Sequence, residues 1–204
     1  LQNGRALRVY IARDAASRVA DPVRTAASEA GVPVFPRLGL RMMLPADYDK
    51  LRYFAYGPLE SYIDKRQASL LGWHVDTVET QYAHPLRPQE SGSHYGARSL
   101  TLHGAQGALR IEGEGFGFSA LNYSQEQLAD VAHDDELSCE DRCVLCLDMA
   151  QRGIGSNSCG PELPACYEIA DHIQWQVMLD PLAEEALFAA LREGSRGGTA
   201  IFIF

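Results

Sequence analysis

Short hydrophobic or alternating runs recur along this chain between turn residues. The runs are separated by glycine, proline and polar residues, and no strand–helix–strand rhythm is present. Many short strands punctuated in this way favour an antiparallel β-sandwich over a doubly wound fold or an α/β barrel. The predicted strands are Leu7–Ile11, Leu38–Met43, Leu51–Ala55, Trp73–Tyr82, Arg98–Leu102, Ala108–Glu112, Phe116–Ala120, Arg142–Ala150 and Ile173–Leu179.

Two segments carry helix signals instead. Ser124 is followed three residues later by Gln127, a capping box that predicts a short helix over Gln125–Ala132. Pro181–Arg192 has acidic residues near its start and hydrophobic residues at helical spacing, which predicts a C-terminal helix.

The domain organisation follows from these elements. We expect one sandwich over residues 1–180 and a C-terminal helix and tail over residues 181–204, in which Ile201–Phe204 forms a short strand. Asp14–Ala30 is rich in alanine, but a proline interrupts it and a glycine follows it. We therefore expect a strand and a long loop there rather than a helix.

Composition and charge exclude several classes of partner. The chain has 204 residues, of which 46% are hydrophobic and 22% charged, with a formal net charge of −9. This balance is typical of a globular chain, and the negative charge disfavours nucleic acid and anionic membranes. No apolar run approaches the roughly 20 residues of a membrane span, and no signal peptide is recognisable. We expect a cytoplasmic protein, unless an N-terminal part is missing.

The cysteines fall in the last third of the chain. Their odd number and their clustering favour free thiols in a reducing compartment over a disulfide framework. The spacing of Cys139, Cys143 and Cys146 allows a zinc site. The apolar character of Arg142–Asp148 instead favours a buried strand in which cysteine acts as a small core residue.

Four segments share a recognisable order and spacing: Tyr56–Arg66, Gln81–Gly92, Phe118–Ser124 and Leu147–Pro161. Read together, they resemble the C-terminal, small-chain (domain 5 type) sandwich of glycoside hydrolase family 2 β-galactosidases. The resemblance implies an all-β antiparallel supersandwich of the galactose-mutarotase type, with the short helix and the C-terminal helix added.

Some positions depart from the family pattern. Ser61 and Ser91 stand where asparagine is usual, and Lys65 alters a charged pair. A serine hydroxyl can still make a local turn hydrogen bond, so the fold is expected to be unaffected. Lysine cannot supply the bidentate fork of arginine, which weakens an ion pair at position 65.

The resemblance also implies a function. The complete enzymes hydrolyse terminal β-D-galactosyl residues by a retaining mechanism, with two glutamates on a (β/α)8 barrel. No glutamate here matches them, so no catalytic residue is assigned and the isolated chain is expected to be inactive. We expect it to pack on the barrel or large subunit, complete the rim of the galactoside site, self-associate and form a homo-oligomer. No cofactor or metal is expected in this chain, although the complete enzyme could hold a divalent metal.

One loop is the candidate for the substrate-site rim. Gly153–Pro161 combines glycines, a Gly-Pro pair and short polar side chains, which suit close approach to a ligand rather than a core. We assign Asn157, Ser158 and Cys159 to the rim. By the resemblance, some members carry tryptophan at the position of Cys159, where it would stack on the sugar.

Two alternatives remain from the sequence. An aldose-epimerase-like sandwich could use His94 and Glu90, with His84 nearby, because a histidine can titrate near neutral pH. A loop position for His94, however, favours a solvated side chain. A free-standing carbohydrate-binding module could use exposed aromatic residues, namely Trp73, Tyr82, Tyr95 and Trp175.

Overall fold

The structure is a computed structural model that describes residues 37–105, 107–152, 163–167, 169, 175–182 and 201–203. Its described strands are β1 (Arg37–Pro45), β2 (Lys50–Gly57), β3 (Leu70–Thr77), β4 (His94–Gly104), β5 (Gly107–Leu121), β6 (Arg142–Gln151), β7 (Val177–Leu182) and β8 (Ile201–Ile203). The predicted strand at Leu7–Ile11 and the expectations for Asp14–Ala30 lie outside the described residues.

The described strands form one antiparallel sheet in the order β3-β2-β4-β5-β6-β1-β8, and β7 pairs with β5. The predicted all-β antiparallel fold is confirmed. The short strand expected near the C-terminus is also confirmed over Ile201–Ile203, where it pairs with β1.

Strand β5 joins two strands that were predicted separately. Its first half pairs with β7 through Ala108–Gly113, and its second half pairs with β6 through Gly117–Leu121. Gly115 lies between them with a φ of 71°, a conformation that glycine adopts at little cost. The polar and glycine residues between the two apolar runs therefore mark a bend within a continuous strand.

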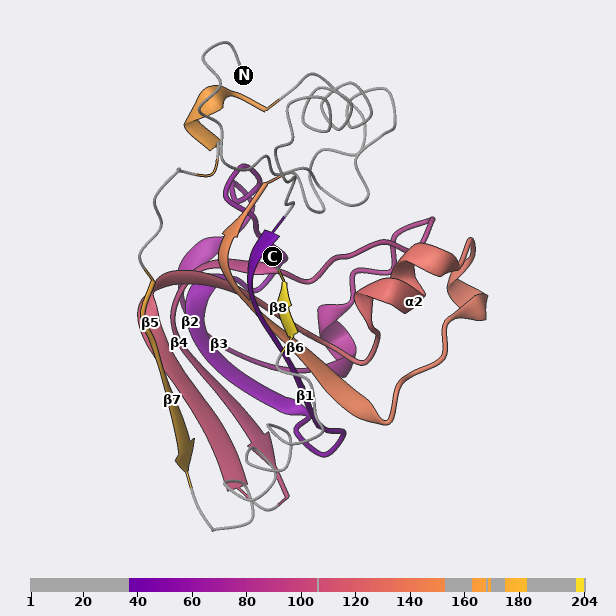
Figure 1. Cartoon of the computed structure of the whole chain (residues 1–204), viewed down its shortest axis with the longest axis horizontal. Coiled ribbons are helices and arrows are strands. Elements are labelled where there is room, and N and C mark those ends of the chain that lie inside the picture. Colours follow the sequence, from indigo (N-terminus) through magenta and orange to yellow (C-terminus); the bar gives the residue numbers. More distant parts are fainter. Residues whose placement is uncertain are drawn as a thin grey trace.

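The sheet curves so that its two ends enclose one apolar core (Figure 1). Leu44 of β1 and Leu145 of β6 belong to the same buried cluster as Tyr53 of β2. The layers of the sandwich are thus made by one sheet folding over itself. Fully buried large side chains in this cluster include Leu51, Leu100, Leu102, Leu109, Ile111, Phe116 and Phe118.

The strand predicted over Trp73–Tyr82 is displaced. It runs from Leu70 to Thr77 and is followed by a 3₁₀ turn at Glu79–Gln81. Asp76 ends the strand because its carboxylate accepts hydrogen bonds from the Thr77 amide (2.9 Å), from the Thr80 hydroxyl and from the Gln81 side chain (3.0 Å). Such side-chain bonds compete with the strand ladder.

One predicted helix is confirmed and the start of the other is wrong. Helix α2 (Gln125–Asp130) begins where predicted, with the Ser124 hydroxyl accepting from the Gln127 amide at 3.4 Å. Pro181 and Leu182, expected to open the C-terminal helix, instead lie in β7 opposite Leu109 and Ala108. Proline is tolerated there because β5 is the one described strand that pairs with β7, so no second described ladder needs its missing amide. The remainder of Pro181–Arg192 lies outside the described residues.

The cysteines of the possible zinc site lie in different surroundings, two of them in β6 and one before it. Cys143 and Cys146 are both buried, but Cys143 packs in the main core whereas Cys146 accepts from the Gln125 side chain at 3.2 Å. Cys139 is exposed beside the Tyr123 hydroxyl. Burial raises the pKa of both the Cys143 and the Cys146 thiols to about 12, so both stay protonated. The core interpretation of these two thiols therefore fits the structure.

Candidate functional site: the polar rim

Two of the sequence segments that carry the family resemblance meet at Glu60. Its carboxylate accepts hydrogen bonds from the Gly92 amide (3.1 Å) and the Tyr62 hydroxyl (3.2 Å), and it pairs with Lys65. The Ser61 amide also donates to the Ser93 carbonyl at 2.7 Å. These contacts order the loops after β2 and before β4 against one another. We call this end of the sheet, marked by Glu60, Ser61, Gly92 and Ser93, the polar rim.

The two serines that replace asparagine make the expected local bonds. The Ser61 hydroxyl donates to the Tyr56 carbonyl and accepts from the Tyr95 amide, each at 2.9 Å. The Ser91 hydroxyl accepts from the Ala83 amide at 3.2 Å. The prediction that serine preserves the turns is confirmed.

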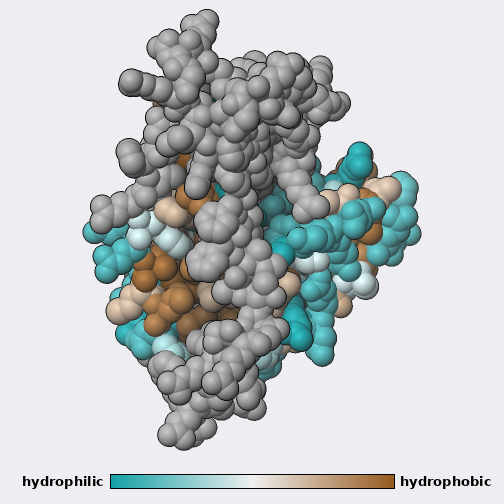
Figure 2. All heavy atoms as spheres, viewed as in Figure 1, coloured by the Kyte–Doolittle hydropathy of each residue, from teal (hydrophilic) through white to brown (hydrophobic). Residues whose placement is uncertain are grey.

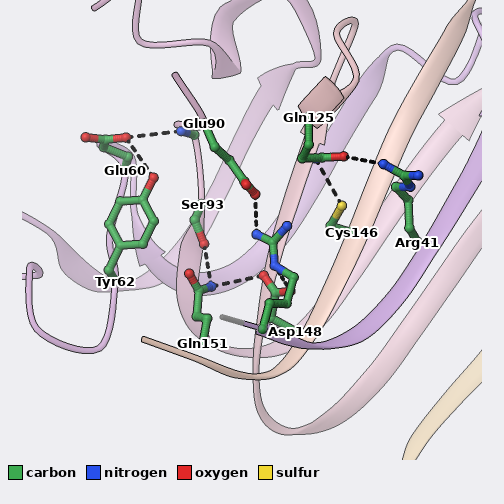
Figure 3. A network of polar contacts seen from close by, with 11 residues as sticks. Arg41, Glu60, Tyr62, Glu90, Ser93, Gln125, Cys146, Asp148 and Gln151 are labelled. Carbon is green, nitrogen blue, oxygen red and sulfur yellow. Dashed lines mark hydrogen bonds and ion pairs between the residues drawn. The ribbon is translucent and has the colours of Figure 1, made fainter. Parts of the chain in front are cut away.

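The buried cation Arg37 pairs with Glu90 and Asp148 next to these loops. Figure 3 shows where these two carboxylates lie. The Arg37 guanidinium pairs with Glu90, and its Nε lies 2.6 Å from Oδ1 of Asp148. Its side chain is 5% exposed and that of Asp148 is 1% exposed, so the pair is shielded from water. Removing one partner of such a buried pair strongly destabilises the folded protein, because the other charge is left buried without compensation.

Burial and the neighbouring charges together set the pKa values of Arg37 and Asp148. Burial raises the pKa of Asp148 to about 7, even though Arg37 beside it favours the ionised form. Burial alone would lower the pKa of Arg37, but Asp148 and Glu90 hold it above its ordinary value. Arg37 therefore stays charged, whereas Asp148 exchanges a proton near neutral pH.

Gln151 extends the network along β6. Its side-chain nitrogen donates to Oδ2 of Asp148 (3.0 Å) and to the Ser93 hydroxyl (3.2 Å). Its side-chain oxygen is buried and accepts no hydrogen bond from any residue that the structure describes. A buried acceptor without a partner is unusual in a folded protein.

Two cavities open on the polar rim. The larger, of about 450 Å³, is lined by residues of the loops after β2 and before β4, including Glu60, Lys65 and Gln81. The smaller, of about 200 Å³, is lined by Asp148 and Gln151 together with Tyr95 and Tyr167.

His94 differs from the sequence-based expectation of a solvated loop residue. It is the first residue of β4 and is 1% exposed, with its ring 4.5 Å from that of Tyr53 and 5.1 Å from that of Phe118. Its ring nitrogens lie 3.1 Å from the Tyr56 carbonyl and 2.7 Å from Oε1 of Gln81. Burial lowers the pKa of His94 to about 4 and outweighs the Tyr56 carbonyl, which favours a protonated ring. The ring is therefore neutral at pH 7. The expectation that it titrates near neutral pH is wrong.

The structure gives the epimerase-type candidates separate partners. Glu90 pairs with Arg37, and His94 contacts Tyr56 and Gln81. His84 is mostly exposed, has a φ of 47°, and lies 2.9 Å from Asp134. Among the described residues, no hydrogen bond or ion pair joins any two of these three side chains.

The aromatic candidates divide by exposure. Trp73 is 53% exposed, but the Arg52 guanidinium lies over its ring at 4.1 Å. Tyr82 is buried in a small cluster with Leu121, and Trp175 packs against the main core. Tyr95 is half-buried and lines the smaller cavity. Tyr95 is thus the aromatic candidate that the structure joins to a cavity.

The predicted substrate-site rim residues Asn157, Ser158 and Cys159 lie outside the described residues, so that assignment stays a prediction. Sequence reasoning missed Arg37, Asp148 and Gln151 as members of a site. The one signal for them was a pair of polar residues, Asp148 and Gln151, at the end of an otherwise apolar strand. Arg37 gave no signal because its partners lie far along the chain.

The curved sheet and its ordered loops define the class of this chain, an all-β sandwich domain with a polar rim. A sequence model of the β-galactosidase small chain matches residues 5–179. The chain is 35% identical over 156 residues to a β-galactosidase of Actinobacillus pleuropneumoniae, covering 76% of this chain and 15% of that protein. It is 38% identical over 149 residues to the Staphylococcus xylosus β-galactosidase, covering 72% and 15% respectively. This chain belongs to the β-galactosidase small-chain family.

The match to a Streptococcus thermophilus β-galactosidase is similar, at 35% identity over 161 residues, with 76% of this chain and 16% of that protein covered. The chain therefore spans about 15% of the length of these relatives. Among the residues that the structure describes, no helix is long and apolar enough to cross a membrane. Within the same residues, no three His, Cys, Asp or Glu side chains gather where they could hold a metal ion.

Proposed function

We propose that this chain is a non-catalytic sandwich domain of a retaining β-galactosidase that hydrolyses terminal β-D-galactosyl residues. The observation that carries the proposal is the small-chain family match in a chain that spans about 15% of its relatives. In this proposal the domain packs on the catalytic barrel or large subunit, and the segment with Asn157, Ser158 and Cys159 completes the rim of the sugar site. The assembly is a cytoplasmic homo-oligomer.

Exposed apolar strands at the margins of the described sheet support a packing role. Among the described strands, β3 pairs only with β2, and it exposes Leu70, Trp73 and Val75. Strand β7 pairs with β5 alone of the strands that the structure describes, and it exposes Met178 and Leu179. Figure 2 shows hydrophobic residues gathered over the part of the sheet where β5 and β7 lie. Exposed apolar side chains on such marginal strands favour association with another protein surface.

The experiment that tests this role is a reconstitution. The 204-residue chain alone should hydrolyse a chromogenic galactoside no faster than buffer, because both catalytic glutamates are proposed to lie on the barrel. Adding it to a β-galactosidase from which the small-chain domain has been deleted should restore turnover. Turnover by the chain alone that a single glutamate substitution abolishes would contradict the proposal.

The rim assignment has its own test in the complete enzyme. Cys159→Trp adds an aromatic surface that can stack on a sugar, so it should change KM or the ratio of transfer to hydrolysis more than it changes stability. Unchanged kinetics with impaired folding would make this segment a structural turn.

A further inference from the structure

We propose that the smaller cavity of the polar rim, which Tyr95 and Tyr167 line, binds a single neutral sugar ring held by Gln151 and Asp148. The site lies within this chain. The proposal therefore does not depend on the catalytic role of the complete enzyme.

An unused acceptor points to a ligand that donates hydrogen bonds. Gln151 uses its side-chain nitrogen to bind Asp148 and Ser93, which fixes the orientation of the amide. Its oxygen is buried without a partner among the described residues, and Figure 3 shows that oxygen turned away from Asp148. A buried acceptor left unpaired costs about 1–3 kcal/mol. A ligand hydroxyl in the cavity would remove that cost.

Asp148 places a second acceptor beside the first. Its Oδ2 takes one hydrogen bond from Gln151, and each carboxylate oxygen can accept two. Two neighbouring acceptors suit the two adjacent hydroxyls of a sugar ring. Arg37 pairs with both Glu90 and Asp148, and burial raises the pKa of Asp148 to about 7, so this group carries little net charge and suits a neutral polyol rather than a cation.

Size and walls favour one ring. The cavity of about 200 Å³ is smaller than the roughly 300–1,000 Å³ of sites for drug-sized ligands. Gly115 and Gly117 line it without side chains, and a Cβ at Gly117 would lie 3.1 Å from the Gln151 side-chain nitrogen. Tyr95 and Tyr167 both line the cavity, but the Arg66 guanidinium lies 5.1 Å over the Tyr95 ring, so the aromatic surface against which the C–H bonds of a sugar can pack is assigned to Tyr167.

The larger cavity offers a contrast within the same rim. Its charged and amide side chains already have partners, since Glu60 pairs with Lys65, and Gln81 contacts Asp76 and His94. No described residue that lines it has a buried polar atom without a hydrogen bond. The unmet hydrogen-bonding capacity is thus confined to the smaller of the two cavities.

The test is a titration of the 204-residue chain with D-galactose, followed by the NMR signals of its tyrosine rings. We expect saturable binding with a Kd of about 1–10 mM, as for a small polar ligand with few contacts. Gln151→Met should weaken binding about tenfold, the effect of losing roughly one hydrogen bond. Gln67→Ala, in the larger cavity, is the matched control and should leave the Kd unchanged.

Tyr167→Ala provides a second variant should Gln151→Met unfold the chain, and it should weaken binding about threefold to tenfold, as expected for a lost aromatic contact. Circular dichroism melting checks that each variant is folded. Four results would each overturn the proposal. The first is no saturation by about 100 mM galactose, a concentration at least about tenfold above the expected Kd. The others are an unchanged Kd in folded Gln151→Met or Tyr167→Ala, equal binding of the acyclic polyol galactitol, and the same signal shifts with sodium chloride alone.

Discussion

The polar rim and strand β3 each depart from the usual placement of side chains. The rim buries charged residues, whereas β3 exposes apolar ones. At the rim, Arg37 and Asp148 are buried charges. On β3, Leu70 and Val75 are 77% and 78% exposed. Buried charges and exposed apolar patches are the informative exceptions in a globular protein. Substitutions at the rim should therefore affect stability most, whereas substitutions at the margin of the sheet should affect association most.

The largest effect is expected from Arg37→Met. The change leaves Glu90 and Asp148 buried without their cation, so we expect the free energy of unfolding to fall by about 3–5 kcal/mol. Urea denaturation measures it. Arg110→Met is the matched control, because Arg110 pairs with Asp180 at a half-exposed site and should cost less than about 1 kcal/mol. Equal losses in the two variants would remove the distinction between rim and surface pairs.

The pH dependence of stability should separate His94 from Asp148. The folded pKa of His94 is about 4, below its ordinary value of 6.5, so its contribution is complete above pH 6.5 and is lost as the pH falls to 4. The folded pKa of Asp148 is raised from 3.8 to about 7, so its contribution has the opposite sign and stability rises as the pH falls through 7. The two effects oppose each other in the unmodified chain.

Single variants should therefore reveal opposite slopes. Asp148→Asn should lose about 3 kcal/mol of stability between pH 6.5 and 4, because His94 is then the described group with the largest slope in this range. His94→Gln should instead gain stability relative to the unmodified chain as the pH falls through the same range. Urea midpoints at several pH values measure both slopes. Parallel slopes in the two variants would contradict the assigned pKa directions.

A smaller effect is expected from Ser61→Ala. The hydroxyl makes two hydrogen bonds that join the loop after β2 to the start of β4, and losing them should cost about 1–2 kcal/mol. Thermal melting compares it with Ser138→Ala, whose exposed hydroxyl contacts only the Gln127 side chain. Ser61→Asn, which restores the usual family residue, should recover part of the loss. A loss no larger than that of Ser138→Ala would show that Ser61 does not order the rim.

The smallest effect on stability is expected at β3. The double change Leu71→Lys with Val75→Lys alters exposed side chains, so it should change the free energy of unfolding by no more than about 0.5 kcal/mol. It should nevertheless reduce self-association, since lysine on an edge strand disfavours pairing with another chain. Sedimentation velocity at several concentrations measures this. Unchanged association would place the contact elsewhere, and a monomeric unmodified chain would contradict self-association itself.

Sequence patterns predicted strands well where burial alternates or is continuous. The bounds of β1, β2 and β6 lie within two residues of the predicted ones, because their neighbours on both sides are strands of the same sheet. The prediction was wrong at Trp73–Tyr82 and at Pro181. In the first case Asp76 ends the strand by accepting hydrogen bonds from Thr77 and Thr80 in the following turn. In the second case Pro181 lies in β7, where a proline is tolerated, although the local spacing predicted a helix.

The family, the antiparallel fold and the capping of helix α2 were determined by the sequence alone, since each depends on residues near one another in the chain or on ordered motifs. The polar rim was decided only by the tertiary structure. Arg37 meets Glu90 and Asp148, and Gln151 meets Ser93, across long separations in sequence. Packing against Tyr53 and Phe118 also buried His94. Burial and partners set the charge of such groups, and neither can be read from a local pattern.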